Sequence, residues 1–391
     1  MCVLFVNHLQ LGTASSYRQA GFAKYLSRSH RSCELIALPA YGSEKAQKGP
    51  GPEHPEEGRE GFTRVRLWKE PLLSGARSNL KLLTSAAQAN PIVHINRANP
   101  YTASLAVAAR RSMRTLVVDM EDWDGIGGYT SYARRYGAAG LLLTLYESTF
   151  PRTAEAVIVV SSVLSTRMQR IGVARSKITV IPNGFDPELF HPDISGRSAR
   201  EAYRLEGYPL LIYISNFWPF ERPVHRLLME SFREVVRRQP GARLVVVGRG
   251  SDLVRDMAKE LGLERNIVLT GFVPRADMPY LLACADIAVH MISDHPFHQA
   301  SSPMIIPEYM AMGKAIVAPR VGELAKMLGG GAGRLVEYGD VQAMATAVLE
   351  LAGDDSSRKA MGLAAAKRAS QLYSYEVLTR RLEEVYQSAS G

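Results

Sequence analysis

One short segment in the second half of the chain combines helix-start residues with a single acid. Ser301, Ser302 and Pro303 precede Met304, and serine and proline are favoured where helices begin. The free N–H groups of a helix N-terminus bind anions without help from a charged side chain. Glu308 follows about two turns later, where its carboxylate can accept hydrogen bonds from a diol. The segment is therefore predicted to bind a diphosphate beside a ribose.

Two charged residues follow apolar runs elsewhere in the chain. Arg222 comes after Leu210–Ile214 and a proline-bearing loop, and Glu121 closely follows residues 116–118. In open parallel sheets, the loops that follow the strands bind ligands at the carboxyl edge. The planar fork of Arg222 suits phosphate oxygens, and the carboxylate of Glu121 can serve as a base or as an electrostatic stabiliser. Both are predicted to be catalytic residues.

Short apolar runs alternate with stretches of helical periodicity along the chain. This pattern is typical of parallel sheets that are covered by helices on both faces. Strands are predicted at residues 3–6, 33–37, 92–95, 116–118 and 156–160, and again at residues 210–214, 243–247, 267–270, 287–290 and 315–317. The predicted fold class is α/β, with two Rossmann-like, doubly wound parallel-sheet domains that face a cleft.

The length of 391 residues suits two domains, each with its own core. Residues 186–198 are rich in proline and aspartate and are predicted to be the linker. We expect the N-terminal domain at residues 1–190 and the C-terminal domain at residues 199–373. A last helix is expected at residues 374–391.

The formal net charge of +9 indicates an anionic partner, such as a nucleotide or an anionic membrane surface. Nucleic acid is not expected, because no basic stretch is interleaved with aromatic residues. Cys2, Cys33 and Cys284 show neither metal spacing nor pairing, which fits a cytoplasmic protein with reduced thiols. No apolar stretch reaches the ~20 residues of a membrane span. We therefore expect a cytoplasmic protein, and any contact with an anionic membrane is expected to be peripheral.

Four short motifs follow one another along the chain. They are Val159-Val160-Ser161, Ile181-Pro182-Asn183-Gly184-Phe185-Asp186, Leu244-Val245-Val246-Val247-Gly248-Arg249-Gly250, and the segment from Ser301 to Ala318. Together they resemble the family 4 retaining glycosyltransferases, which have the GT-B fold, and the resemblance extends over nearly all of the chain. It implies an enzyme that moves a hexose-type sugar from a nucleoside diphosphate sugar to an acceptor, with retention and without a metal or another cofactor. The acceptor class stays open between a small molecule, a glycan and a lipid-linked compound.

The resemblance also assigns site residues. The donor-binding set is Gly12, Asn216, Arg222, Gly248, Arg249, Ser301, Ser302, Pro303, Met304 and Glu308. Glu121 takes the position of the acceptor-side group nearest the reacting sugar. A divalent ion at the acidic run of residues 119–124 is the weaker interpretation, because this run belongs to the acceptor domain and the diphosphate should lie on the other one.

Three positions depart from the family pattern. Ala300 replaces the first of two glutamates, Asn216 replaces an arginine, and Glu121 replaces a histidine. These departures leave open a pseudoenzyme or partner subunit that binds a sugar nucleotide without turnover. A separate alternative is a GT-B epimerase that acts on the nucleotide sugar.

Overall fold

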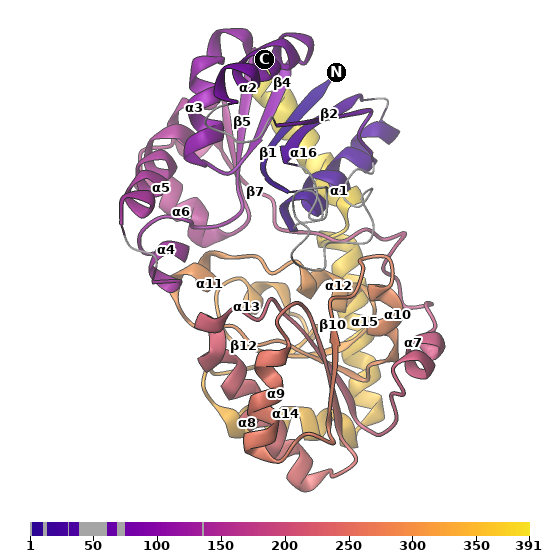
Figure 1. Ribbon diagram of the computed structural model, residues 1–391. Helices are drawn as coiled ribbons and strands as arrows, with labels where there is room; N and C mark the ends of the chain where they lie inside the picture. Colours follow the sequence, from indigo (N-terminus) through magenta and orange to yellow (C-terminus); the bar gives the residue numbers. More distant parts are fainter. Residues whose placement is uncertain (1, 11–13, 30, 39–60, 69–74, 135–136) are drawn as a thin grey trace. The chain divides into compact units, whose positions relative to one another are not determined.

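The computed structural model describes residues 2–10, 14–29, 31–38, 61–68, 75–134 and 137–391. The chain divides into two compact units (Figure 1). Unit 1 comprises Met1–Gly184, Ala300–Ser302 and Tyr375–Gly391, and unit 2 comprises Phe185–Gln299 and Pro303–Ser374. Each unit is built on a parallel sheet, so the predicted α/β class with two Rossmann-like domains is confirmed.

Unit 1 contains a seven-stranded sheet in the order β3-β2-β1-β4-β5-β6-β7. Its strands are β1 (Val3–Gln10), β2 (Cys33–Leu38), β3 (Arg64–Leu67), β4 (Ile92–Asn96), β5 (Thr115–Met120), β6 (Ala156–Val159) and β7 (Ile178–Val180). Successive residues of β1 enter two different apolar clusters, Leu4 and Val6 in one and Val3 and Phe5 in the other. Because both faces are buried, the strand appears in the sequence as a continuous apolar run.

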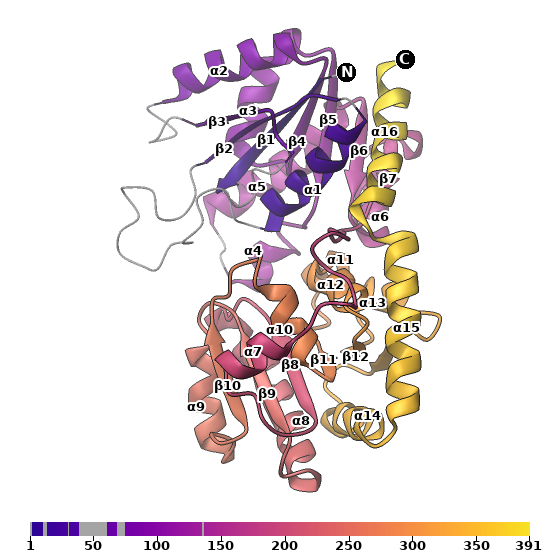
Figure 2. The ribbon, with the colours of Figure 1, turned by 90° about the vertical axis from the view of Figure 1, so that its right-hand side faces the viewer.

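Helices cover both faces of the unit 1 sheet. They are α1 (Ala14–Arg28), α2 (Ala76–Ala89), α3 (Pro100–Ala108), α4 (Tyr129–Tyr132), α5 (Ala138–Thr149), α6 (Ser162–Arg170) and α16 (Tyr375–Ser390). Helix α16 is the last helix of the chain, and it packs against α1 and against strands β5 and β6 (Figure 2). The end of the chain is therefore part of the same unit as its beginning.

Unit 2 contains a six-stranded sheet in the order β10-β9-β8-β11-β12-β13. Its strands are β8 (Leu210–Ile214), β9 (Arg243–Val247), β10 (Ile267–Gly271), β11 (Ile287–Val289), β12 (Ala315–Pro319) and β13 (Arg334–Val336). The helices between Arg197 and Leu372 are α7 (Arg197–Ala202), α8 (Arg222–Arg238), α9 (Asp252–Leu261), α10 (Met278–Cys284), α11 (Pro296–Ala300), α12 (Ile305–Ala311), α13 (Leu324–Met327), α14 (Val341–Gly353) and α15 (Asp355–Leu372). Among the described residues, no helix combines the length and the apolar composition needed to cross a membrane.

Two features of the fold differ from the sequence predictions. The strands β3, β7 and β13 were not predicted, and all three lie at the edges of their sheets. Edge strands are short and carry polar residues, so they lack the apolar run of a central strand. The predicted linker, residues 186–198, belongs to unit 2, because Phe190 is buried in the core of that unit. The boundary between the units falls at Gly184 and Phe185.

Candidate active site

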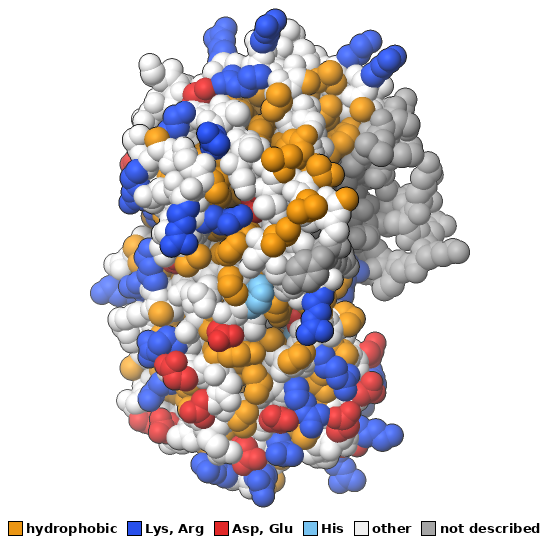
Figure 3. Space-filling model, turned by 90° about the vertical axis from the view of Figure 1, so that its left-hand side faces the viewer, with side chains coloured by type: hydrophobic (Ala, Val, Ile, Leu, Met, Phe, Trp, Pro, Cys, Tyr) orange, Lys and Arg blue, Asp and Glu red, His pale blue; other side chains and the backbone are white. Residues whose placement is uncertain are grey.

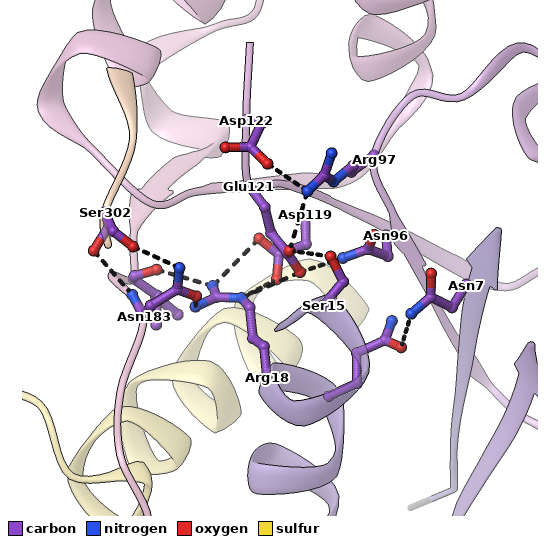
Figure 4. A network of polar contacts seen from close by, with 12 residues as sticks. Asn7, Ser15, Arg18, Asn96, Arg97, Asp119, Glu121, Asp122, Asn183 and Ser302 are labelled. Carbon is purple, nitrogen blue, oxygen red and sulfur yellow. Dashed lines mark hydrogen bonds and ion pairs between the residues drawn. The ribbon is translucent and has the colours of Figure 1, made fainter. Parts of the chain in front are cut away.

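Unit 1 holds a buried polar centre at the carboxyl edge of its sheet (Figure 4). The contributing residues are Ser15 and Arg18 from α1, Asn96 and Arg97 at and after the end of β4, and Asp119, Glu121 and Asp122 at and after the end of β5. Carboxyl ends of parallel strands meet at one edge of a sheet, which brings together residues that are far apart in the sequence.

Glu121 is only 5% exposed, and both of its oxygens are bonded. Ser15 Oγ donates to Oε2 at 2.5 Å, and Asn96 Nδ2 donates to Oε1. Guanidinium nitrogens of Arg18 and Arg97 lie 3.8 and 3.9 Å from the carboxylate. Burial raises the pKa of Glu121, and the charge of Arg97 opposes that rise. A carboxyl group with a raised pKa can exchange a proton closer to neutral pH than an ordinary glutamate can.

Arg18 is fully buried and organises the centre. Its Nε and Nη2 atoms donate to the two oxygens of Asp119 at 2.8 and 3.3 Å. The same guanidinium donates to the carbonyl oxygens of Ile181 at 2.9 Å and Pro182 at 2.8 Å. A buried arginine needs this full set of acceptors to offset its desolvation. The Ile-Pro-Asn-Gly motif is therefore held in unit 1 by an arginine that no sequence motif indicated.

The motif in turn holds residues Ala300–Ser302 in unit 1. Asn183 Nδ2 donates to the carbonyl oxygen of Ser302 at 2.7 Å, and Ser161 Oγ donates to that of Ala300 at 2.6 Å. The side chain of Ala300 is fully buried in an apolar cluster. The position where the family has its first glutamate is therefore a core position in this chain.

Arg97 takes a strained backbone conformation beside Glu121. Its φ of 59° lies in the left-handed region, which is unfavourable for residues with a side chain. In this conformation it forms ion pairs with Asp122 and with Asp124, the latter at 3.1 Å. Burial raises the pKa of Asp122 to about 7, although Arg97 opposes that rise. Strain of this kind concentrates at functional sites.

His94 is structural in this arrangement. Its ring is fully buried, with Nδ1 at 2.7 Å from the Tyr386 hydroxyl and Nε2 at 3.4 Å from Asp119 Oδ2. It therefore connects strand β4 to helix α16. Gly12, which the resemblance assigned to the donor-binding set, lies outside the described residues.

Unit 2 places Glu308 in the first turn of α12, about one turn closer to the helix start than predicted. The helix begins only at Ile305, because Met304 occupies the N-cap position. Glu308 is 3% exposed, and its Oε1 lies 2.7 Å from Nη1 of Arg275. Burial raises the pKa of Glu308, and Arg275 opposes that rise. Arg275 was not identified in the sequence, since it lies in no recognisable motif.

Helix α12 is fixed at the carboxyl end of strand β8. The backbone N–H of Ile214, the last residue of β8, donates to the Tyr309 hydroxyl at 3.1 Å. Arg275 approaches from the loop that follows β10. Glu308 therefore lies at the edge of the sheet where ligands of doubly wound folds bind.

Three predicted donor residues lie in the loops after β8 and β9. Arg222 begins α8 with a side chain that is 46% exposed, and its Nη2 is 3.5 Å from Glu260. Asn216 is exposed directly after β8. Arg249 is exposed after β9, with its guanidinium 4.2 Å from the centre of the Phe272 ring. These polar side chains therefore face solvent, unlike the charges of unit 1.

Gly248 occupies a position that no other residue fits. Its φ is 138°, and a Cβ atom there would lie 1.9 Å from the carbonyl oxygen of Ser215. The glycine thus lets the loop after β9 approach the loop after β8 closely. Next to these loops, His298 Nδ1 is 2.8 Å from Ser293 Oγ and its Nε2 is 3.5 Å from Glu221, the residue before Arg222. The loop after β11 is therefore connected to the turn that presents Arg222.

No cluster of three or more histidine, cysteine, aspartate or glutamate side chains suited to a metal ion occurs in the described part of the chain. In unit 1, the buried atoms Gln19 Nε2, Asn96 Oδ1 and Arg97 Nε make no hydrogen bond to any residue that the structure describes. Buried polar groups are normally bonded, so the centre has capacity for a further polar partner.

Two family descriptions match the chain. Residues 208–354 match "Glycosyl transferases group 1", and residues 16–184 match "Glycosyl transferase 4-like domain". The curated relatives include a GDP-mannose-dependent alpha-(1-6)-phosphatidylinositol monomannoside mannosyltransferase from Mycolicibacterium smegmatis, 29% identical over 59% of this chain and 62% of that protein. A D-inositol 3-phosphate glycosyltransferase from Corynebacterium aurimucosum is 28% identical over 60% of this chain and 57% of that protein. The matched segment therefore spans about three-fifths of these relatives.

Solved structures share the fold over the full length. Alr3699/HepE from Anabaena, in complex with UDP-glucose, has a TM-score of 0.76 at 20% identity and covers 99% of this chain and 100% of that one. A sucrose-phosphate synthase from Thermosynechococcus elongatus has a TM-score of 0.73 at 17% identity, covering 99% and 98%. The predicted GT-B fold and the predicted family are thereby confirmed: the chain belongs to the family 4 glycosyltransferases, described as glycosyl transferases group 1.

Proposed function

We propose that this chain is a retaining glycosyltransferase that moves a hexose-type sugar from a nucleoside diphosphate sugar to an acceptor. Family membership supports the reaction class. Retention is proposed from the resemblance to retaining enzymes, and the cytoplasmic location remains a prediction from the sequence. Unit 2 is proposed to bind the donor, and unit 1 to bind the acceptor.

The buried pair of Glu308 and Arg275 is the observation that carries the proposal. A carboxylate that is 3% exposed in an apolar helix needs a reason to be there, since burial without compensation is costly. Its position at the carboxyl end of β8 suits hydrogen bonds to a ribose diol. Arg275 supplies the positive charge that keeps the carboxylate available in the apolar surroundings.

The exposed cations of unit 2 are proposed to stabilise the leaving diphosphate. Negative charge develops on the diphosphate as the bond to the sugar breaks, and preorganised positive groups lower that barrier. Arg222 is suited to this role because the carboxylate of Glu260, 3.5 Å away, also forms an ion pair with Arg226. Glu260 therefore neutralises the charge of Arg222 only in part. Arg249 is proposed to compensate for the neutral side chain of Asn216.

Glu121 is proposed to act on the sugar side of the reaction, either as a base for the acceptor or as a stabiliser of positive charge at the anomeric carbon. Its fixed geometry and its raised pKa support this role. The net charge of residues 1–184 favours an anionic acceptor, because they contain 23 lysines and arginines but only 13 aspartates and glutamates.

The test is incubation of the full chain with a panel of nucleoside diphosphate sugars, including UDP-glucose and GDP-mannose. We expect one donor to bind and to be hydrolysed slowly in the absence of acceptor, with the activity unchanged by EDTA. Formation of an isomerised sugar nucleotide would instead identify an epimerase. Binding without turnover under every condition would identify a pseudoenzyme, and loss of turnover in EDTA would overturn the metal-independent reaction.

A further inference from the structure

Helix α5 presents an apolar face to solvent. Leu141, Leu142 and Leu145 are 62%, 48% and 55% exposed, and a group of exposed leucines on one helix is more informative than single exposed leucines are. Ala138 and Thr149 continue the same face, at helical spacing before and after the leucines. The one charged residue of α5, Glu147, is buried on the inner face.

Two neighbouring elements extend this face. Val107 of α3 and Ile126 of the loop after β5 are 57% and 40% exposed. Helix α3 packs against α5, with Ser104 Oγ 2.6 Å from the Tyr146 hydroxyl. The N–H of Ile126 donates to Thr144 Oγ1 of α5 at 2.8 Å. We refer to Val107, Ile126, Leu141, Leu142 and Leu145 as the leucine surface.

The exposed charges of the same region are mainly positive. Between residues 75 and 184, the described lysines and arginines that are exposed are Arg77, Lys81, Arg111, Arg114, Arg134, Arg152, Arg170, Arg175 and Lys177. In the same described range, every aspartate and glutamate is buried or half-buried. Figure 3 shows this side of the molecule, with hydrophobic side chains gathered on the upper part, Lys and Arg side chains mainly at its top and left, and few Asp and Glu side chains among them.

We propose that the leucine surface docks unit 1 onto an anionic lipid membrane. Exposed apolar side chains in a region whose exposed charges are mainly positive fit the interface of an anionic bilayer, where leucines enter the acyl boundary and arginines contact the headgroups. An anionic bilayer attracts positive charge over its whole surface, whereas a protein partner usually presents charges of both signs. Helix α5 has 12 residues, or about 18 Å, and is therefore suited to lie along the interface rather than to cross it.

The inner face of α5 connects the docking surface to the polar centre. Glu147 accepts hydrogen bonds from the backbone N–H groups of Asp124 at 2.7 Å and Gly125 at 3.2 Å. This loop follows Glu121 directly in the sequence. Docking would hold the loop near the headgroups, where a lipid-linked acceptor is presented. That consequence rests on the proposed function, whereas the docking itself does not.

The test is flotation of the full chain with vesicles of phosphatidylcholine alone and of phosphatidylcholine with phosphatidylglycerol, without any nucleotide sugar. We expect binding only to the anionic vesicles, and weaker binding at high salt. L141Q/L142Q/L145Q should weaken that binding at least tenfold, because glutamine preserves the helix and removes the apolar contact. R111Q/R114Q should weaken it and also reduce its dependence on salt.

Leu363→Gln is the matched control, since Leu363 of α15 is 73% exposed in unit 2 and carries no role in docking. It should bind vesicles like the wild type. Far-UV circular dichroism and thermal melting establish that each variant is folded. The proposal is overturned if the wild type ignores anionic vesicles, if the triple variant binds them unchanged, or if the triple substitution instead dissociates a dimer in sedimentation. None of these results depends on sugar transfer, so they leave the proposed function untouched.

Discussion

The charged side chains in the polar centre of unit 1 are buried and hydrogen-bonded within the protein, whereas those in the loops of unit 2 are exposed and have fewer protein partners. Glu121 is 5% exposed and is bonded at both oxygens, whereas Arg222 is 46% exposed with one carboxylate at 3.5 Å. Burial and hydrogen bonding fix the geometry of Glu121, whereas the exposed charge of Arg222 can meet a ligand. Glu308 combines the two, because it is buried and, among the described residues, forms an ion pair with Arg275 alone.

The difference suggests a division of labour. A group that acts on a reacting bond must be held rigidly, and buried hydrogen bonds provide that rigidity. A group that stabilises a departing anion must remain available, because its partner leaves at the end of each turnover. Substitutions in the two regions should therefore affect different steps of the reaction.

The largest expected effect is on turnover in Glu121→Gln. The amide preserves the size of the side chain but removes the charge, so turnover should fall by ~10²-fold or more. Glu155→Gln is the control, because Glu155 is a half-buried acid of unit 1 that pairs with Arg110 away from the polar centre. Steady-state kinetics with the preferred donor measure the effect, and equal losses in both variants would show that Glu121 has no special role.

Glu308→Ala should weaken nucleotide binding at least tenfold, because charge-assisted hydrogen bonds contribute ~1.5 to 3 kcal/mol. Glu350→Gln, an exposed acid of α14 that pairs with Arg334, is the control in the same unit. Titration calorimetry with the preferred nucleoside diphosphate measures the affinity. If the Glu308 variant keeps its affinity, the donor-site assignment is wrong.

Arg222→Ala should lower turnover about tenfold and change the affinity for the bare nucleoside little, because the charge that it meets grows in the transition state. Arg226→Ala is a close control, since Arg226 lies one turn further on α8 and binds the same Glu260 carboxylate. Only the Arg222 variant should lose turnover. Identical kinetics in the two variants would remove Arg222 from the site and make Arg249 the candidate.

Ala300→Glu restores the family pattern, and we expect it to lower the free energy of unfolding by roughly 2 kcal/mol or more without raising activity. The side chain of Ala300 is fully buried among apolar residues, where an unpaired carboxylate is costly. Ala300→Ser, a small change at the same position, should cost less. Denaturant unfolding measures the difference, and a stable variant with higher turnover would contradict the assignment of this position to the core.

The smallest expected effect is a change of slope in the pH dependence of stability. Burial raises the pKa of Asp122 from 3.8 to about 7. Between these values the folded state retains a proton that the unfolded state has lost, so the free energy of unfolding should fall as pH rises from about 4 to about 7. Asp122→Asn should make that decline shallower. Burial also raises the pKa of Glu147 to about 7, so Glu147 should account for part of the decline that remains in the variant. If the slope in Asp122→Asn equals that of the wild type, Asp122 does not contribute to the decline.

Central strands were predictable because their apolar runs are continuous. Leu210–Ile214 and Arg243–Val247 were placed at their observed bounds, since both are buried on two faces. The edge strand Arg64–Leu67 was missed because it carries two arginines and none of its residues is buried.

The motifs located the loops around the candidate sites, but they did not reveal the contacts within them. Arg18 and Arg275 were missed because their roles depend on partners far away in the sequence, Asp119 and Glu308. Neither arginine belongs to a local pattern. Only the fold brings each of them to its carboxylate.

The most direct test of the division of labour is to measure nucleoside diphosphate affinity and turnover together in Glu121→Gln and Glu308→Ala. The account predicts that Glu121→Gln keeps the wild-type affinity while losing turnover, and that Glu308→Ala loses affinity at least tenfold. If Glu121→Gln loses nucleotide affinity as strongly as Glu308→Ala does, the two units do not divide donor binding and sugar chemistry between them.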